Sequence, residues 1–210
     1  MIVYEEMDKK QMLECAAIAA KAFYDYEYFG IYITDDEKRK RFLDELIKCE
    51  FKANVNLDDV KFLIAREDDK ILAIVQLCAP DFETPSDWTY IKSGWLKVLF
   101  KGGLKAVNAW HEMELKASAP CHLRNKGKTW YISLLTVNKS AEGRGIGSKF
   151  INECIIPYIK ERGAEALCLF TNSEINRKFY EKNGLSVFDE KHFSYNGKSI
   201  GSWSYLMELK

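Results

Sequence analysis

A net charge, long apolar runs and internal repeats are all missing from this chain. Its 210 residues carry 31 Lys and Arg and 31 Asp and Glu, so the formal net charge is zero at pH 7. Proteins that bind nucleic acid by neutralising phosphates need a basic excess, so no nucleic-acid partner is expected. The longest apolar runs, such as residues 71–75, are far below the ~20 residues of a membrane span. No membrane partner is therefore expected.

The cysteines lack the spacing of a metal site or a redox motif. No C-x-x-C pair and no nearby histidine set accompanies the six, which are Cys15, Cys49, Cys78, Cys121, Cys154 and Cys168. Four of them fall in apolar-patterned segments, where a free thiol acts as a small hydrophobe. The first residues also lack a basic region leading into an apolar one, so no secretory signal is expected. These absences predict a cytoplasmic protein without disulfides and without a metal.

Linkers are missing as well, because the chain has four prolines and no stretch rich in Pro, Gly or Ser. We therefore expect a single domain over residues 1–210, with a partly helical insertion at about 79–128. Apolar periodicity predicts helices at 8–24, 35–53, 94–116, 145–162 and 174–183. Alternating or continuous apolar runs predict strands at 2–6, 60–66, 71–78, 130–137, 166–170, 187–195 and 199–209. This order predicts an α/β protein with a mixed sheet.

The most informative segment is rich in glycine and follows a predicted strand. After strand 130–137 and a short turn, the sequence Gly-Arg-Gly-Ile-Gly of residues 143–147 opens a helix. The first amides of a helix have no intrahelical acceptor, and glycines let an anion approach the backbone closely. The pattern predicts a phosphate or pyrophosphate site, to which Arg144 and Lys149 could add charge. A glycine-rich helix start without a ligand is the alternative.

A second cluster covers residues 171–184. It places Asn172 at a strand end, and Asn176 one helical turn before Tyr180. A phenol held beside a bound substrate can donate a proton to a leaving anion. The alternative for Tyr180 is an aromatic helix residue that packs on the sheet, as the neighbouring Phe179 would.

Together the two clusters resemble the GNAT superfamily of acetyl-CoA-dependent N-acetyltransferases. The segment Glu142–Gly147 matches the position of the family's pyrophosphate loop, usually Gln/Arg-x-x-Gly-x-Gly/Ala. The pattern Asn176-x-x-Phe-Tyr180-x-x-x-Gly184 matches the family helix that carries a general-acid tyrosine. The resemblance covers residues 130–188 closely and the rest of the chain by the order of its elements.

Three further features look like puromycin N-acetyltransferase-like members of that superfamily. They are the Trp-Tyr-Ile start of strand 130–137, Pro157 inside the following helix, and the preceding insertion with its His and Met residues. Two positions depart from the usual pattern, because Glu142 stands where Gln or Arg is usual and Leu185 where Phe is usual. An acidic side chain would repel a pyrophosphate, so Glu142 is expected to turn outward and to offer only its backbone amide.

The resemblance implies the GNAT fold, a central mixed and mostly antiparallel sheet with a splayed parallel pair, flanked by helices. It implies acetyl-CoA as cosubstrate, no metal, and transfer of the acetyl group to a primary amine of a small molecule. The amine would attack directly through a tetrahedral intermediate, and Tyr180 would protonate the departing thiolate. The residues implied to bind the cosubstrate are Leu135, Val137, Gly143, Arg144, Gly145, Ile146, Gly147, Ser148, Asn172 and Asn176.

The general base is less defined than the acid. Many family members use a strand glutamate, but strand 130–137 contains none. Glu112 and Glu114 in the insertion, with His111 and His122 nearby, are candidates if they face the cleft. Each of them would more often be a solvated charge on a helix, so none is assigned.

The acceptor site is expected between the first two helices and the insertion, where aromatic residues are frequent. A pocket lined by such rings would suit an apolar or aromatic amine, or one held by cation–π contact. The alternative is that the rings pack a lid and a core. The residues concerned are Phe23, Tyr24, Tyr26, Tyr28, Phe29, Tyr32, Trp88, Tyr90, Trp95 and Trp110.

Three other classes of protein share some of these sequence features with an acetyltransferase. A non-catalytic acyl-CoA-binding or sensor domain would keep the same fold, and the missing strand glutamate leaves it open. A nicotinamide-dependent enzyme would have its glycine turn after the first strand, whereas here the turn follows two hairpin strands. A nucleotide-triphosphatase loop is excluded, because Gly-Lys-Ser/Thr does not follow a four-residue gap. A homodimer is left open.

Overall fold

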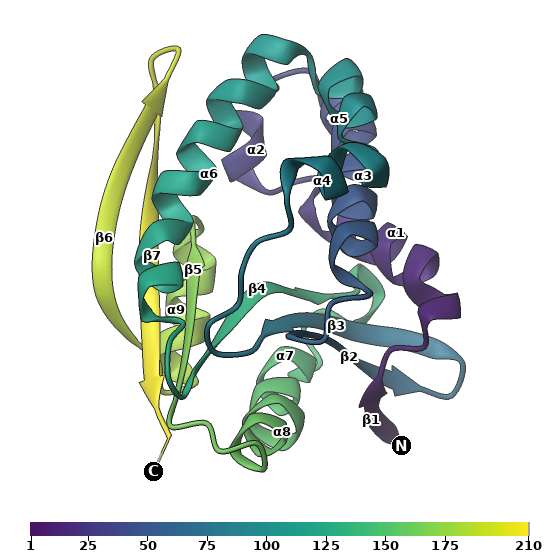
Figure 1. Cartoon of the computed structure of the whole chain (residues 1–210), viewed down its shortest axis with the longest axis vertical. Helices are drawn as coiled ribbons and strands as arrows, with labels where there is room; N and C mark the ends of the chain where they lie inside the picture. The colour runs from purple at the N-terminus through teal and green to yellow at the C-terminus, as the bar shows by residue number, and fades with distance from the viewer. Residues whose placement is uncertain (210) are drawn as a thin grey trace.

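A seven-stranded sheet organises the chain, of which the computed structural model describes residues 1–209. Its order is β1-β2-β3-β4-β5-β7-β6, and the β4–β5 pair is parallel while the other neighbours are antiparallel (Figure 1). The strands are β1 (Ile2–Glu6), β2 (Val60–Glu67), β3 (Lys70–Cys78), β4 (Thr129–Val137), β5 (Ala166–Thr171), β6 (Ser186–Tyr195) and β7 (Lys198–Glu208). The mixed, mostly antiparallel sheet with one parallel pair confirms the predicted fold class.

Helices cover both faces of this sheet (Figure 1). Toward the N-terminus lie α1 (Met12–Phe23), α2 (Glu27–Gly30) and α3 (Asp36–Asn54), and the insertion forms α4 (Asp87–Ser93), α5 (Trp95–Gly102) and α6 (Leu104–Arg124). The other helical segments are α7 (Ile146–Lys149), a π-helical stretch (Phe150–Ile155), α8 (Ile156–Lys160) and α9 (Glu174–Lys182). Short 3-10 turns occupy Lys9–Gln11 and Lys139–Ala141.

The periodicity of the apolar residues explains which face each helix covers. The helix of residues 146–160 buries Phe150, Ile151, Ile155 and Ile159 on one stripe, against the face that also carries Tyr180 of α9. Each such fully buried side chain contributes roughly 1.5–3 kcal/mol of transfer free energy. Helices α1 and α3 cover the opposite face, and α1 contributes the small residues Cys15, Ala16, Ala19 and Ala20. A third cluster joins α2, α3, α5 and α6.

The insertion is more helical than its sequence predicts. Helix α6 continues past residue 116 to Arg124 and contains Pro120, which the sequence suggested would break the pattern. A proline has no amide hydrogen, so the Lys116 carbonyl four residues earlier loses its helical donor. Lys191 of β6 donates to that carbonyl instead, at 2.9 Å. The tertiary contact therefore supplies the hydrogen bond that the proline removes.

Replacing Lys191 by methionine is expected to leave the Lys116 carbonyl without a donor from the protein. We expect a loss of about 1 kcal/mol of stability, which lowers Tm by roughly 2–4 °C for a chain of this size. Lys191 also lies 3.5 Å from Asp189, so Asp189→Asn is the control that removes only the exposed ion pair. Thermal unfolding of both variants tests the assignment, which fails if the two variants lose equal stability.

The helix that contains Pro157 widens just before the proline. The backbone is π-helical over Phe150–Ile155, and this wider turn accommodates a residue without an amide hydrogen.

The turn between β6 and β7 has the geometry that its sequence predicts. Asn196 and Gly197 have φ of 48° and 77°, the two left-handed positions of a type I′ hairpin turn. The β6–β7 hairpin that this turn closes rises beside α6 (Figure 1).

Candidate active site

The parallel strands β4 and β5 separate near the middle of β4. Their register ends at Ile132 opposite Leu169, although β4 continues to Val137. A bulge at Ser133 accompanies the separation and shifts the register against β3. Beyond it, Leu135 and Val137 are half-buried and pack on the same cluster as α7 and α8. The edge of β4 that faces β5 therefore has no strand partner there, and an extended chain could lie along it.

The glycine-rich loop lies where β4 leads into α7. Gly143 and Gly145 have φ of +75° and +73°, and nothing lies within 4 Å of a Cβ built at either position. Both are exposed, so this left-handed backbone is open to an incoming group. Gly147 is buried instead, and a Cβ there would meet Phe179 of α9 at 3.0 Å. Glycine at this position thus lets the loop lie directly against the helix that carries Tyr180.

The charged side chains of the loop are engaged elsewhere. Arg144 pairs with Glu67, at the end of β2, at 2.8 Å, and this contact holds the pKa of Glu67 below its usual value. Glu142 is exposed as expected, but its amide donates to the Lys139 carbonyl at 3.4 Å and is not free. Arg144 is therefore already paired, which leaves the backbone amides at the start of the helix to contact an anion.

Tyr180 is buried on α9. Its ring lies 5.8 Å from that of Tyr205 and 5.1 Å from that of Phe179. Burial, and secondarily the nearby Tyr26, raises the pKa of Tyr180 above its usual value of 10. Its hydroxyl has no hydrogen-bond partner within residues 1–209. The phenol is therefore protonated at neutral pH and free to donate its proton.

Tyr26 reaches the end of β5 from the connection between α1 and α2. Its hydroxyl accepts a hydrogen bond from the Asn172 amide at 2.9 Å and shares one with Thr171 Oγ1 at 3.1 Å. The side chains of Asn172 and Asn176 are used within the protein, because Asn172 Nδ2 donates to the Gly201 carbonyl and Asn176 Nδ2 to Thr171 Oγ1. Tyr26 thus joins a polar cluster at the end of β5, and it also contributes to the raised pKa of Tyr180.

Two half-buried glutamates, Glu50 of α3 and Glu114 of α6, lie inside the helical layer. Burial raises the pKa of each to about 7, and the Glu114 charge contributes to the shift of Glu50. Glu50 accepts a hydrogen bond from Tyr90 at 3.1 Å, and Glu114 accepts one from Tyr28. Neither has an ion pair with any residue from 1 to 209. Buried carboxylates without a cation are typical of functional sites.

The other base candidates from the insertion have different surroundings. Glu112 is exposed and pairs with Lys116 at 2.7 Å, which lowers the pKa of Glu112. His111 packs on the Trp95 ring at 5.4 Å, and burial lowers its pKa. His122 lies on the last turn of α6 against the Tyr131 ring at 5.1 Å, and burial lowers its pKa too.

Most of the aromatic residues predicted around the acceptor site pack on one another. Phe29 lies 5.9 Å from Trp110 and 4.9 Å from Tyr28, within the cluster of α2, α3, α5 and α6. Trp88 faces solvent, with 62% of its surface exposed. The rings thus form mainly a core, from which the hydroxyls of Tyr26 and Tyr28 extend to Thr171 and Glu114.

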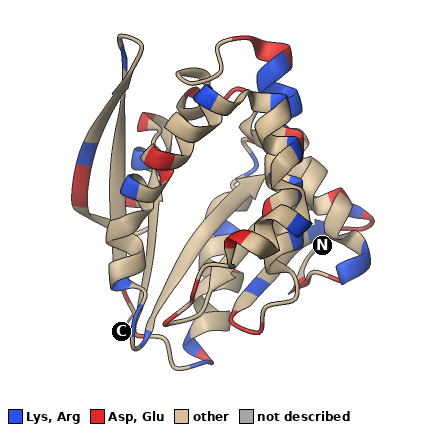
Figure 2. Cartoon of the chain, turned by 45° about the horizontal axis from the view of Figure 1, so that its top comes forward, with Lys and Arg blue, Asp and Glu red and all other residues tan. Residues whose placement is uncertain are grey.

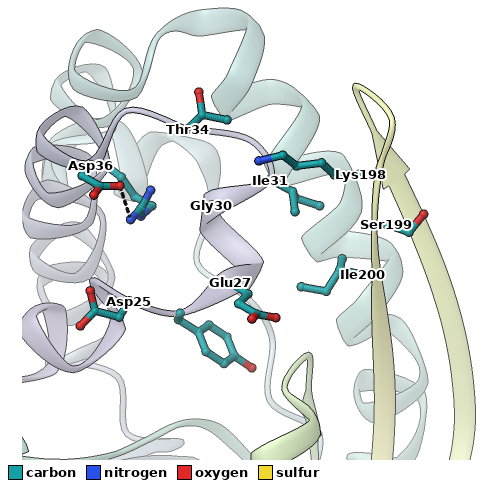
Figure 3. Close-up of a pocket in the computed structure, with 11 residues that line it drawn as sticks. Asp25, Glu27, Gly30, Ile31, Thr34, Asp36, Lys198, Ser199 and Ile200 are labelled. Atoms are coloured by element: carbon teal, nitrogen blue, oxygen red, sulfur yellow. Dashed lines mark hydrogen bonds and ion pairs between the residues drawn. The ribbon is translucent and has the colours of Figure 1, made fainter.

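A cavity of about 630 Å³ opens between the α1–α3 connection and the β6–β7 hairpin. Figure 3 shows Glu27, Gly30 and Ile31 on one side of it and Ser199 and Ile200 of β7 on the other. Tyr26 also lines the cavity, which therefore adjoins the polar cluster at the end of β5. The volume is that of a typical small-molecule site.

The charges on the lining are mostly paired. Asp36 pairs with Arg39 at 2.8 Å, and Asp25 pairs with Lys139. Glu27 has no ion pair within the part of the chain that the structure describes. Basic and acidic residues are both distributed over the helices (Figure 2). Within residues 1–209, no group of three or more His, Cys, Asp or Glu side chains could hold a metal ion, and no helix is long and apolar enough to cross a bilayer.

Comparisons with known proteins assign the chain to a family. The model of the acetyltransferase (GNAT) family matches residues 26–185, so the chain belongs to this family. This confirms the family predicted from the glycine-rich loop and the Tyr180 helix. No protein with a curated description matches the sequence.

Solved structures of acetyltransferases share the fold. A structure described as histone acetyltransferase HPA2 and related acetyltransferase, from Corynebacterium glutamicum, is 14% identical with a TM-score of 0.64, and the match covers 100% of this chain and 97% of that one. A GCN5-related N-acetyltransferase from Rhodopseudomonas palustris is 15% identical with a TM-score of 0.57, covering 99% and 95%. A Bacillus subtilis acetyltransferase in complex with CoA is 13% identical with a TM-score of 0.51, covering 100% and 98%. At these identities the likeness shows the fold alone.

Proposed function

We propose that this protein is an N-acetyltransferase that moves the acetyl group of acetyl-CoA to a primary amine of a small molecule. The observation that carries the proposal is the meeting of three features at one place. The open glycine-rich loop, the divergence of β4 from β5, and the protonated Tyr180 lie together, and Gly147 of the loop approaches Phe179 next to Tyr180. Family membership supports acyl transfer in general.

The site fits the cosubstrate that the family implies. The backbone of residues 143–148 would hold the pyrophosphate, because its left-handed glycines are exposed and leave room for oxygens near the amides. Leu135 and Val137 would flank the pantetheine arm along the free edge of β4. We assign Asn172 and Asn176 to the same end of β5, where their side chains hold the wall of the site in place. Acetyl-CoA supplies the acetyl group as a thioester.

Tyr180 would act as the general acid. When the acceptor nitrogen bonds to the acetyl carbon, the carbon–sulfur bond breaks and the thiolate needs a proton. The Tyr180 hydroxyl is protonated and has no competing hydrogen bond, so it can donate that proton. Holding amine and thioester side by side supplies a further large part of the rate.

The acceptor would enter through the cavity beside Tyr26. Its volume of about 630 Å³ suits a small molecule rather than a protein chain. Glu27 and Lys198 on its lining have no ion pair with a described residue, and Glu27 would contact a protonated amine. We also propose a cytoplasmic location, supported by six free and buried thiols.

Thermal unfolding with and without acetyl-CoA tests the cosubstrate, with NADH as the control ligand. A hundredfold excess over Kd adds about 2.7 kcal/mol, which raises Tm by roughly 5–11 °C for a chain of this size. We expect this shift with acetyl-CoA and none with NADH, and then release of CoA thiol with one or more small amines. A folded sample without the shift would contradict the proposal. Binding without thiol release from any amine would indicate an acyl-CoA-binding protein instead.

A further inference from the structure

Glu114 has a position on α6 that no other carboxylate of the insertion shares. It is four residues from Trp110 and three from Ala117, both of which are buried on the inner stripe of the helix. Its Oε2 accepts a hydrogen bond from Tyr28, and its Oε1 has no partner within residues 1–209. The side chain is half-buried, so the fold does not wholly enclose the carboxylate.

The surroundings of Glu114 contain no compensating cation. The groups whose titration is linked to it are Tyr28 of α2, Tyr26 just before α2, Glu50 of α3 and Tyr131 of β4. All four are neutral or acidic. Lys191 of β6, which contacts the same helix, is occupied by the Lys116 carbonyl and Asp189. A carboxylate placed inside the protein without a cation costs stability unless a ligand uses it.

Tyr26 connects Glu114 with the proposed acid. Burial raises the pKa of Tyr26, and the charge of Glu114 raises it further. The same Tyr26 contributes to the raised pKa of Tyr180 on the far side. The geometry agrees, because Tyr28, which donates to Glu114 of α6, has its ring 5.9 Å from that of Tyr26. The Tyr26 hydroxyl is itself fixed at the end of β5, where the parallel strands have diverged.

We propose that Glu114 is the general base of this acetyltransferase and that the insertion helix α6 supplies the group that the sheet lacks. The inference rests on the function proposed above. The base would receive the acceptor nitrogen's proton on Oε1, while Tyr28 holds Oε2 in place.

The proton balance of the step uses both residues. The acceptor first releases its ammonium proton to water, and the neutral nitrogen then forms a bond to the acetyl carbon and loses one further proton to Glu114. The carbon–sulfur bond breaks, and the sulfur takes one proton from Tyr180. The products are the amide and the CoA thiol, and exchange with water then returns both residues to their starting states. Neither an oxidant nor a metal takes part in this balance.

The expected pH dependence follows from the raised pKa of Glu114. Burial raises this pKa to about 7, so the carboxylate is protonated and unable to accept a proton below that value. Acetyl transfer by the wild type should therefore fall as pH drops through about 7. Part of any such fall comes from protonation of the acceptor amine itself. Profiles of wild type and variant with the same amine separate the two contributions.

The test is the variant Glu114→Gln, measured with acetyl-CoA and an amine that the wild type acetylates. An amide oxygen still accepts the Tyr28 hydrogen bond, so the fold and the acetyl-CoA thermal shift should be retained. We expect kcat/KM to fall by about 10²–10⁴, the usual contribution of a general base. The part of the pH dependence that comes from titration of Glu114 should disappear from the rate profile of the variant. Glu114→Asp should recover part of the activity.

Glu112→Gln is the matched control, since it removes a carboxylate two residues away on the exposed face of α6. We expect its rate and pH profile to equal those of the wild type. A Glu114→Gln variant that binds acetyl-CoA and acetylates the amine as fast as Glu112→Gln, with the same profile, would overturn the assignment. A wild type that releases no thiol with any amine would instead overturn the proposed function itself.

Discussion

Replacing Tyr180 by phenylalanine is expected to lower kcat by about 10²–10⁴ while leaving acetyl-CoA affinity unchanged. The reason is that the hydroxyl makes no hydrogen bond to residues 1–209, so its removal costs little structure. Its ring contacts with Tyr205 and Phe179 would remain. Steady-state release of CoA thiol measures the rate, and the acetyl-CoA thermal shift measures binding.

Tyr158→Phe provides the comparison for Tyr180→Phe. Tyr158 lies on α8, and its hydroxyl donates to Glu6 at 2.6 Å, away from the loop and from β5. Loss of that exposed hydrogen bond should cost about 1 kcal/mol of stability and no activity. If Tyr180→Phe turned over acetyl-CoA as fast as Tyr158→Phe, Tyr180 would be a packing residue and not the acid.

Substituting alanine for Gly145 is expected to weaken acetyl-CoA binding at least about tenfold. At φ of +73° an L-residue pays about 1–2 kcal/mol of backbone strain. The added methyl group would also occupy the open space through which phosphate oxygens reach the amides. Loss of one hydrogen bond to a charged group is worth about 1.5–3 kcal/mol, and each 1.4 kcal/mol is tenfold in Kd.

Gly163→Ala separates strain from ligand contact. Gly163 follows α8 with φ of +78° and has nothing within 4 Å of a built Cβ, so the substitution meets the same backbone cost. Both variants should lose similar Tm in the absence of ligand, roughly 2–8 °C. Only Gly145→Ala should lose the rise in Tm that acetyl-CoA causes. Equal acetyl-CoA affinity in the two variants would show that the glycine-rich loop does not bind the cosubstrate.

The insertion contains a choice that the sequence does not make. Glu112 and Glu114 are two residues apart and equal in chemistry, so the sequence offers both as candidates for the base. Their difference lies in helical phase, because two residues turn about 200° around a helix. Glu114 falls between Trp110 and Ala117 on the buried stripe, and Glu112 falls outside it. Glu50 could have been noticed in the same way, as an acid within the apolar stripe of α3 between Leu46 and Asn54.

Pro120 hides the true length of helix α6 in the sequence. A proline normally ends a helix, so the sequence predicts that this helix stops near residue 116. Lys191 donates the hydrogen bond that the Lys116 carbonyl lacks. The two residues are 75 positions apart, so no local sequence pattern could reveal this contact. The extra turns place Cys121 on the buried stripe and fix the helix against β4 and β5.

The sequence by itself determined the family, the mixed sheet, the glycine-rich loop and the tyrosine helix. These features depend on neighbouring residues, through hydrophobic period, the φ freedom of glycine and motif spacing. Only the tertiary structure decided that Arg144 pairs with Glu67, that Tyr26 reaches Thr171, and that Glu114 rather than Glu112 faces the interior. Those contacts join residues 77, 145 and 86 positions apart. Their existence depends on how helices and strands pack, which local preferences do not specify.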